Sequence, residues 1–331
     1  MSVALLELDR LSLGFSGPEG RPTEVLREVS FSLGSGEIVG LVGESGSGKS
    51  LTALSILGLE PSSARITGGA VRLRGNDLRG RSDREMAKIR GREIGMVFQE
   101  ARVALNPVLT IGSQITETIR AHDTISRREA RRRGTELLDR VGIPDPEERM
   151  GSYPHELSGG QCQRVTIAMA LAAGPEILLA DEPTTGLDVT IQAQILELLR
   201  RLRRDLGLSV LLVTHDLGVV AETCDRVVVL YAGEVVEEGS VEAIFEAPAH
   251  PYTRALLRAV PRLGDPAPRG EMSAIPGSSP SAEERPAGCP FHPRCPEVME
   301  VCRRRHPGIF SGEGGRPVRC FLYSSEGEAS R

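Results

Sequence analysis

The stretch that decides the fold is Gly43-Glu44-Ser45-Gly46-Ser47-Gly48-Lys49-Ser50, which follows an apolar run at 38–42 and precedes a helix-like segment at 51–57. The spacing GxxxxGKS between a strand and a helix is typical of a phosphate-binding loop, or P-loop. Glycines leave backbone N–H groups free to point at phosphates with no Cβ in the way. Lys49 is predicted to contact the β- and γ-phosphates, and the Ser50 hydroxyl to ligate Mg²⁺. A chance match in a Gly/Ser-rich turn would lack this flanking strand and helix.

Length and composition limit the function classes. The chain has 331 residues, enough for one large domain and a smaller one or for two ordinary domains. A hydrophobic content of 40% supports a sizeable core. Aromatic residues make up only 3%, there is no Trp, and the net charge is -5, so we expect no nucleic-acid partner.

The sequence also bears on location. Acidic residues occur within Met1–Asp9, too early for a signal peptide, so we expect the protein to stay in the cytoplasm. No apolar run approaches the roughly 20 residues that cross a bilayer, because the best candidates are interrupted at Pro175-Glu176 and Thr214-His215-Asp216. Any membrane association is therefore expected to run through a partner.

Two adjacent carboxylates end an apolar run, Ile177-Leu178-Leu179-Ala180-Asp181-Glu182. In a parallel sheet, charges at the carboxyl end of a strand fall in the ligand crevice. Asp181 is predicted to hold Mg²⁺, and Glu182 to polarise the attacking water. The tight loop 183–188 follows at once, which argues against a strand end that simply emerges into solvent.

Three further residues are candidates for the nucleotide site. Gln99 follows the strand-like segment 93–98 and can reach a metal ion or a water, although a Gln after a strand means little alone. His215 ends a second buried strand at 209–214, which favours a γ-phosphate contact over a structural role. Phe15 either stacks on an adenine ring or belongs to the core, and its spacing favours neither.

A second anion site is predicted at Leu157-Ser158-Gly159-Gly160-Gln161, directly before the helix-like segment 165–172. Ser158 is a good N-cap, and the paired glycines expose backbone N–H groups. The region from about 111 to 150 has a helical, polar pattern. Its Arg-rich run at 126–133 is interleaved with glutamates, so we interpret it as a solvated helix face.

Together these motifs resemble the ATP-binding subunits of ABC transporters over residues 1 to about 240, and LSGGQ at 157–161 is the discriminating element. The resemblance implies an α/β P-loop NTPase with a mostly parallel sheet, an antiparallel β subdomain and a helical subdomain at about 100–160. It implies ATP hydrolysis with Glu182 as general base, His215 on the γ-phosphate and Mg²⁺ held through Ser50, Gln99 and Asp181. The 157–161 segment would act in trans on the nucleotide of a second subunit, and Asp188 would belong to the family's D-loop.

A narrower resemblance to oligopeptide/dipeptide importer subunits rests on Leu105-Asn106-Pro107 and on segments 250–257, 275–277 and 288–296. It implies a similar but distinct ATPase partner, two membrane permeases and an external binding protein. The 99–120 stretch would face the permeases, placing the chain on the cytoplasmic face of the membrane. Related importers for nickel or glutathione carry similar subunits, so the substrate stays open.

Two other classes of protein fit the sequence less well. A soluble ABC ATPase of DNA repair or translation usually has two cassettes or long coiled-coil insertions, whereas this chain shows one cassette and no heptad run. A P-loop kinase for a small molecule gives no role to LSGGQ or to His215.

Beyond residue 240, we expect a helix and a Pro-rich linker at 241–285 and a Cys-rich region at 286–331, with four of the six cysteines at Cys289, Cys295, Cys302 and Cys320. Disulfides are disfavoured in a reducing compartment, which favours metal binding. The spacings of five and six are wider than in zinc sites, and prolines directly after two of the cysteines are typical of iron–sulfur loops. Some importers of the resembled family carry such a cluster here.

We therefore expect a [4Fe-4S] cluster in this region. Zinc, with His292 or His306 as substitute ligands, is the alternative, and reduced thiols come last. Cys162 and Cys224 are expected to be small buried residues.

Overall fold

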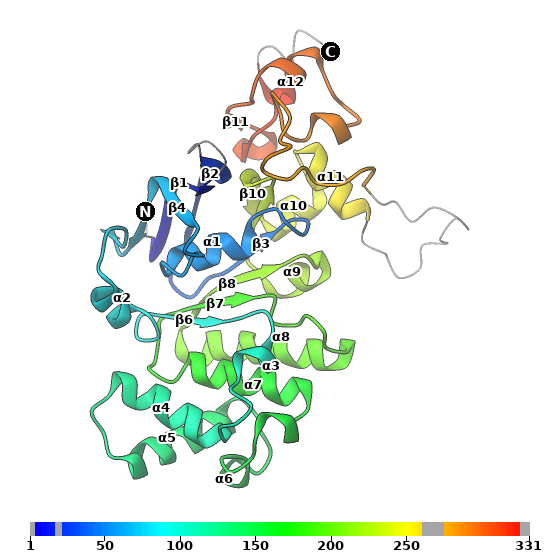
Figure 1. Ribbon diagram of the computed structural model, residues 1–331. Helices are drawn as coiled ribbons and strands as arrows, with labels where there is room; N and C mark the ends of the chain where they lie inside the picture. The colour runs from blue at the N-terminus through cyan, green and yellow to red at the C-terminus, as the bar shows by residue number, and fades with distance from the viewer. Residues whose placement is uncertain (1–3, 17–21, 260–274, 325–331) are drawn as a thin grey trace.

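The computed structural model describes residues 4–16, 22–259 and 275–324 and contains two β-sheets, the larger with helices on both faces (Figure 1). The smaller sheet is antiparallel with strand order β2-β1-β4-β5. Its strands are β1 (Leu6–Ser16), β2 (Pro22–Leu33), β4 (Ala64–Leu73) and β5 (Asn76–Asp77). The apolar side chains of β1 and β2 form one core with α1 (Lys49–Ile56) and with the facing side of the larger sheet.

Strands at 3–6 and 29–33 are predicted from the sequence. The observed strands are longer, because the pairing of β1 with β2 continues from Leu6 opposite Leu33 to Ser16 opposite Pro22. Residue 3 lies outside the described residues.

The larger sheet has strand order β11-β12-β10-β9-β3-β8-β7-β6. Its strands are β3 (Ile38–Val42), β6 (Ile94–Val97), β7 (Ile177–Asp181), β8 (Ser209–Thr214), β9 (Arg226–Tyr231), β10 (Glu234–Ser240), β11 (Phe310–Ser311) and β12 (Pro317–Val318). The five strands from β9 to β6 are parallel. Every residue of β3, β7 and β8 is buried, as expected for central strands covered on both faces. The predicted α/β fold is confirmed.

Helices divide between the two faces of this sheet. The remaining helices as far as β9 are α2 (Asp83–Ile89), α3 (Ala101–Ala104), α4 (Ile111–His122), α5 (Arg127–Arg140), α6 (Pro146–Arg149), α7 (Gly159–Ala170), α8 (Val189–Leu206) and α9 (Leu217–Thr223). α1 lies on the face nearer the antiparallel sheet, whereas α7 and α8 share a second core with α4 and α5 on the other face (Figure 1).

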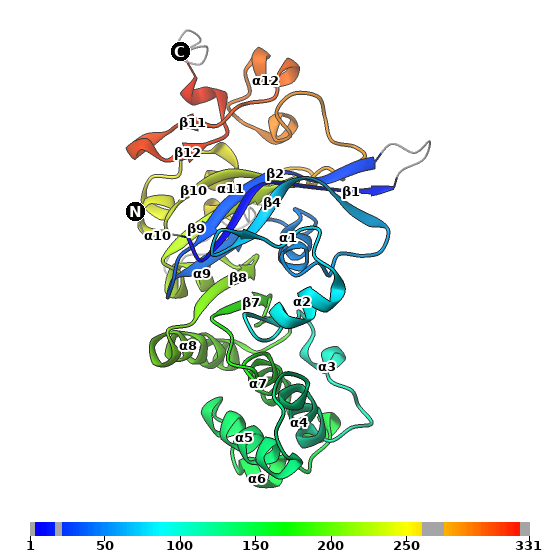
Figure 2. The same ribbon diagram turned by 90° about the vertical axis from the view of Figure 1, so that its left-hand side faces the viewer.

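The helical region α4–α6 and the C-terminal segment lie at opposite ends of the molecule (Figure 2). The Arg-rich run lies on α5, where exposed Arg132 pairs with Glu129 and Glu136 one turn away. The solvated-face interpretation is confirmed.

The C-terminal segment comprises α10 (Val241–Glu246), α11 (Pro251–Arg258), α12 (Glu300–Arg304) and three short 3-10 turns. Strand β12 pairs with β10 through Val318 opposite Glu237, so this segment extends the larger sheet. α11 matches the helix predicted around 252–260, whereas most of the linker predicted after it, residues 260–274, lies outside the described residues. Of the helices in the described ranges, none is long and apolar enough to cross a bilayer.

Candidate nucleotide site

The P-loop connects β3 to α1 with a backbone that glycine permits. Gly46 and Gly48 have φ angles of 78° and 103°, in the left-handed region where a side chain is strained. A Cβ on Gly43 would lie 2.1 Å from the Leu230 carbonyl oxygen, so β9 closes directly under the loop. The backbone conformation and the close packing of the loop therefore require glycine at these positions, which agrees with the predicted phosphate cradle.

Lys49 lies inside this loop, at the first position of α1. Its Nζ donates to the carbonyl oxygens of Gly43 (2.8 Å) and Glu44 (3.0 Å). Burial lowers the pKa of Lys49, while the charges of Glu182, Asp181 and Glu44 act in the opposite direction. The ammonium group is thus held among carbonyls and carboxylates, where the phosphates of a nucleotide are further partners for it.

Ser50 and Asp181 come together although they are 131 residues apart in sequence. The Ser50 hydroxyl donates to Asp181 Oδ1 at 3.0 Å. Asp181 is 5% exposed, and burial raises its pKa. A hydroxyl and a buried carboxylate are oxygen ligands of the kind that Mg²⁺ prefers, so this pair fits the predicted ion. The third predicted ligand, Gln99, lies next to Glu182.

Glu182 is the meeting point of the predicted catalytic residues. Gln99 Nε2 lies 3.1 Å and Thr185 Oγ1 2.8 Å from its Oε2, and His215 Nδ1 lies 3.1 Å from its Oε1. Burial alone would raise the pKa of Glu182, but the hydrogen bonds from Thr185 and His215 and the nearby positive charges outweigh it and hold the pKa below the usual value. The side chain is therefore a carboxylate at neutral pH.

This convergence follows from the sheet. β7 and β8 are parallel neighbours, so Glu182 and His215 leave the same edge, and β6 delivers Gln99 beside them. Glu182 has φ 43°, an uncommon value for a residue with a side chain. The turn that it starts brings Thr185 back to its carboxylate, a contact that sequence analysis missed because the separation of three residues carries no motif.

The LSGGQ segment begins α7. Ser158 Oγ accepts from the Gln161 N–H, and Gln161 Oε1 accepts from the Ser158 N–H, which forms a capping box. A Cβ on Gly160 would lie 2.6 Å from Ile191 Cγ2, so the segment packs closely on α8, which Asp188 caps. α7 and α1 lie on opposite faces of the sheet (Figure 1), so the two glycine-rich loops do not share one crevice within the chain.

Phe15 lies in β1, partly buried against the core of the antiparallel sheet. This packing supports the interpretation of Phe15 as a core residue, and its stacking on an adenine ring stays a prediction.

The four C-terminal cysteines line one small cavity with a volume of about 10 Å³. Their thiols are donors suited to iron or zinc. However, the space holds about one water molecule, far less than a four-iron cluster needs. In the described part of the chain, no group of three or more His, Cys, Asp or Glu residues is arranged to hold a metal ion. The metal prediction stays a prediction.

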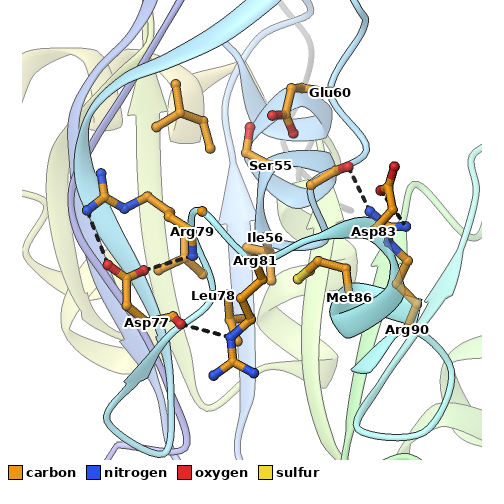
Figure 3. Close-up of a pocket in the computed structure, with 14 residues that line it drawn as sticks. Ser55, Ile56, Glu60, Asp77, Leu78, Arg79, Arg81, Asp83, Met86 and Arg90 are labelled. Carbon is orange, nitrogen blue, oxygen red and sulfur yellow. Dashed lines mark hydrogen bonds and ion pairs between the residues drawn. The ribbon is translucent and has the colours of Figure 1, made fainter. Parts of the chain in front are cut away.

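A larger cleft of about 560 Å³ lies between α1, β4, β5 and α2 (Figure 3). Two of its arginines are paired with carboxylates, Arg79 with Asp77 at 3.2 Å and Arg90 with Asp83 at 3.6 Å. It contains none of the predicted nucleotide residues, so its size does not make it the functional site.

Two family models match successive parts of this chain. The model described as "ABC transporter" matches residues 26–185, and the model described as "Oligopeptide/dipeptide transporter, C-terminal region" matches residues 236–302. The oligopeptide transport ATP-binding protein AppD of Bacillus subtilis is 48% identical over 98% of both chains. The chain belongs to the ABC transporter family.

Other relatives agree. The dipeptide transport ATP-binding protein DppD of Escherichia coli is 46% identical over 96% of both chains. A solved dimeric ATP-binding cassette, in a post-hydrolysis state with ADP and Pi, is 34% identical, covers 71% of this chain and 98% of its own, and has a TM-score of 0.64. With an ABC cassette and these relatives, the chain is an ATPase.

Proposed function

We propose that this ABC ATPase powers the import of peptides, with Glu182 as general base. The observation that carries the site assignment is the convergence of Gln99, Thr185 and His215 on the Glu182 carboxylate beside the Ser50–Asp181 pair. The substrate class rests on the named relatives, which are oligopeptide and dipeptide transport proteins, and on the matching C-terminal region.

In this mechanism the P-loop N–H groups and Lys49 bind the phosphates, and Mg²⁺ on Ser50, Asp181 and Gln99 supplies charge neutralisation when bound. Glu182 accepts a proton from the water that attacks the γ-phosphorus, and Gln99 and His215 orient that carboxylate, the water and the γ-phosphate. Asp188 and the 157–161 segment complete the site of a second ATPase subunit in this proposal, since they begin α8 and α7, which pack on the face of the sheet opposite α1.

We assign residues 1–240 to the ATPase domain, 241–285 to a connecting helix and linker, and 286–331 to a C-terminal region.

The proposed membrane partners would bind an apolar surface near β6. Between β6, α4 and α7 lies an apolar groove of about 300 Å³, next to large exposed apolar side chains in the 98–109 stretch, namely Phe98, Val103, Val108 and Leu109. This surface suits contact with a membrane permease, and two permeases would hold the pair of ATPase subunits at the cytoplasmic face of the membrane, with a separate binding protein outside.

Uptake by cells that lack the gene tests the proposal. The parental chain restores uptake of labelled di- and oligopeptides, and Glu182→Gln does not. Restored uptake of nickel or glutathione alone would replace the peptide assignment, and ATPase activity with no effect on any uptake would favour a soluble ABC ATPase.

The metal prediction has its own test. We keep the [4Fe-4S] cluster on Cys289, Cys295, Cys302 and Cys320 as a proposal, and its binding requires the cavity between these residues to widen from about 10 Å³. Anaerobic purification followed by iron, sulfide and zinc analysis is expected to give about four irons per chain. One zinc without iron rejects the cluster, and a folded metal-free chain rejects both metals.

A further inference from the structure

Glu44, the second residue of the P-loop, is held at three points. Its carbonyl oxygen accepts from Lys49 Nζ, and its N–H donates to the Tyr252 hydroxyl of α11 at 2.9 Å. Its carboxylate accepts two hydrogen bonds from Arg294, at 2.6 and 2.8 Å. The last two partners come from the C-terminal part of the chain, so that part reaches directly into the nucleotide site.

Arg294 is built into this position rather than lying loosely on the surface. Its side chain is 6% exposed, and its remaining N–H groups donate to the carbonyl oxygens of residues 275–277. Nη1 also lies 3.4 Å from the Tyr231 hydroxyl. The paired, two-bond geometry with Glu44 is the strong form of an arginine–carboxylate contact, and it raises the pKa of Arg294 further.

The charge of Glu44 makes this pair relevant to nucleotide binding. The carboxylate is near enough to Lys49 to act on its pKa, and Lys49 is the residue placed to meet phosphates. An unpaired carboxylate at this point would repel an anionic ligand and compete for the ammonium group. Paired with Arg294, its charge is compensated by the guanidinium group, which holds both of its oxygens.

We propose that Arg294 is a positioning residue that keeps the Glu44 carboxylate out of the phosphate cradle, so that the C-terminal region sets the affinity of the P-loop for ATP. It acts through Glu44 and does not take part in the chemical step, which is carried by residues at the ends of β6, β7 and β8. The proposal rests on the assigned nucleotide site.

The test measures the Kd for MgATP, the KM and the kcat of the full-length chain and of Arg294→Ala, Arg294→Lys and Glu44→Gln. Arg294→Ala is expected to raise Kd and KM about tenfold with kcat within about twofold, because the freed Glu44 charge repels the phosphates and competes for Lys49, and a charge–charge effect near a protein surface is of about that size. Arg294→Lys keeps the positive charge but loses the two-bond guanidinium geometry, so its Kd should lie between that of the parental chain and that of Arg294→Ala. In a Glu44→Gln background, Arg294→Ala should raise Kd by less than about twofold, because no free carboxylate remains.

Arg254→Ala is the matched control. Arg254 also lies in the C-terminal part, pairs with Glu297 at 2.6 Å and donates to the carbonyl oxygens of Pro248 and Ala249, but it does not contact the P-loop. Both alanine variants should lower the Tm, and only Arg294→Ala should weaken ATP binding. Equal Kd values for the two alanine variants, or an undiminished effect in the Glu44→Gln background, would overturn the proposal. A parental chain that binds no MgATP would instead overturn the nucleotide-site assignment itself.

Discussion

At the scale of single residues, the molecule concentrates its chemistry on Glu182. The carboxylate is 12% exposed and has three hydrogen-bonding neighbours, Gln99, Thr185 and His215. Its lowered pKa keeps it ionised far below neutral pH, so a base that can accept a proton is present throughout the range in which enzymes work.

Replacing Glu182 with Gln should separate binding from hydrolysis. The amide keeps the shape of the side chain and its contacts with Thr185 and His215, but it cannot accept the proton of the attacking water. We expect kcat to fall by about 100-fold or more while the Kd for MgATP stays within a few-fold of the parental value. Phosphate release and nucleotide titration measure the two quantities.

Glu176→Gln is the control for this substitution, because Glu176 precedes β7, is 59% exposed and pairs with Arg74 away from the site. It should leave kcat unchanged. Hydrolysis by Glu182→Gln at close to the parental rate would remove Glu182 from the role of base.

At the scale of elements, the start of α7 has two roles that can be separated. Ser158 caps the helix as Ser126 caps α5, each with its hydroxyl accepting an N–H three residues later. The two hydroxyl contacts are alike, at 3.3 and 3.2 Å, although only α7 adds the return bond of a capping box, and only Ser158 belongs to the LSGGQ segment. Comparing substitutions of Ser158 and Ser126 can thus distinguish loss of helix capping, which both share, from loss of a function specific to the LSGGQ segment.

Ser158→Ala and Ser126→Ala should each lower the free energy of unfolding by about 1 kcal/mol, the usual value of such a cap. Only Ser158→Ala should also impair ATP-dependent dimerisation and hydrolysis, with ATP binding by the single chain retained. Denaturant unfolding and light scattering with MgATP measure these effects. Equal dimerisation of the two variants would mean that Ser158 is a cap alone.

The elements also show how far sequence reasoning reaches. β3, β7 and β8 were predictable because an apolar run ends at a motif in each case, and α1 because the P-loop motif begins it; the sheet then brings Glu182 and His215 to one edge. β11 and β12 have two residues each, too few to show a period. The contact of Arg294 with Glu44 spans 250 residues, and no local pattern reports such a pairing.

At the scale of the whole molecule, the P-loop begins α1 and the LSGGQ segment begins α7 on the opposite face of the larger sheet, and in the proposed mechanism two chains complete each nucleotide site. The dimeric cassette among the structural relatives has the same fold as this chain. We therefore expect the ATPase rate per chain to rise with protein concentration and with a partner ATPase subunit.

Mixing two inactive variants tests the shared site directly. Lys49→Ala disables the P-loop and Ser158→Ala the trans-acting segment, so a mixed dimer has one intact site of two. Random pairing places half of the dimers in this state, which predicts about a quarter of the parental rate for an equal mixture at saturating concentration. No recovery above the separate variants would contradict sites formed between two copies of this chain, and the same mixing with the partner ATPase subunit would then test sites formed with that subunit.

The hydrogen bond from the Glu44 N–H to the Tyr252 hydroxyl has a consequence for the fluorescence of the protein. The chain has four Tyr and no Trp, so ultraviolet light absorbed by its phenols is not passed to an indole. Two of these phenols, Tyr231 and Tyr252, lie with ring centroids 4.5 Å apart, one bonded to Glu44 and the other beside Arg294. Any ligand that shifts the loop changes the surroundings of both rings, so the unlabelled chain can signal nucleotide binding through its own tyrosine fluorescence.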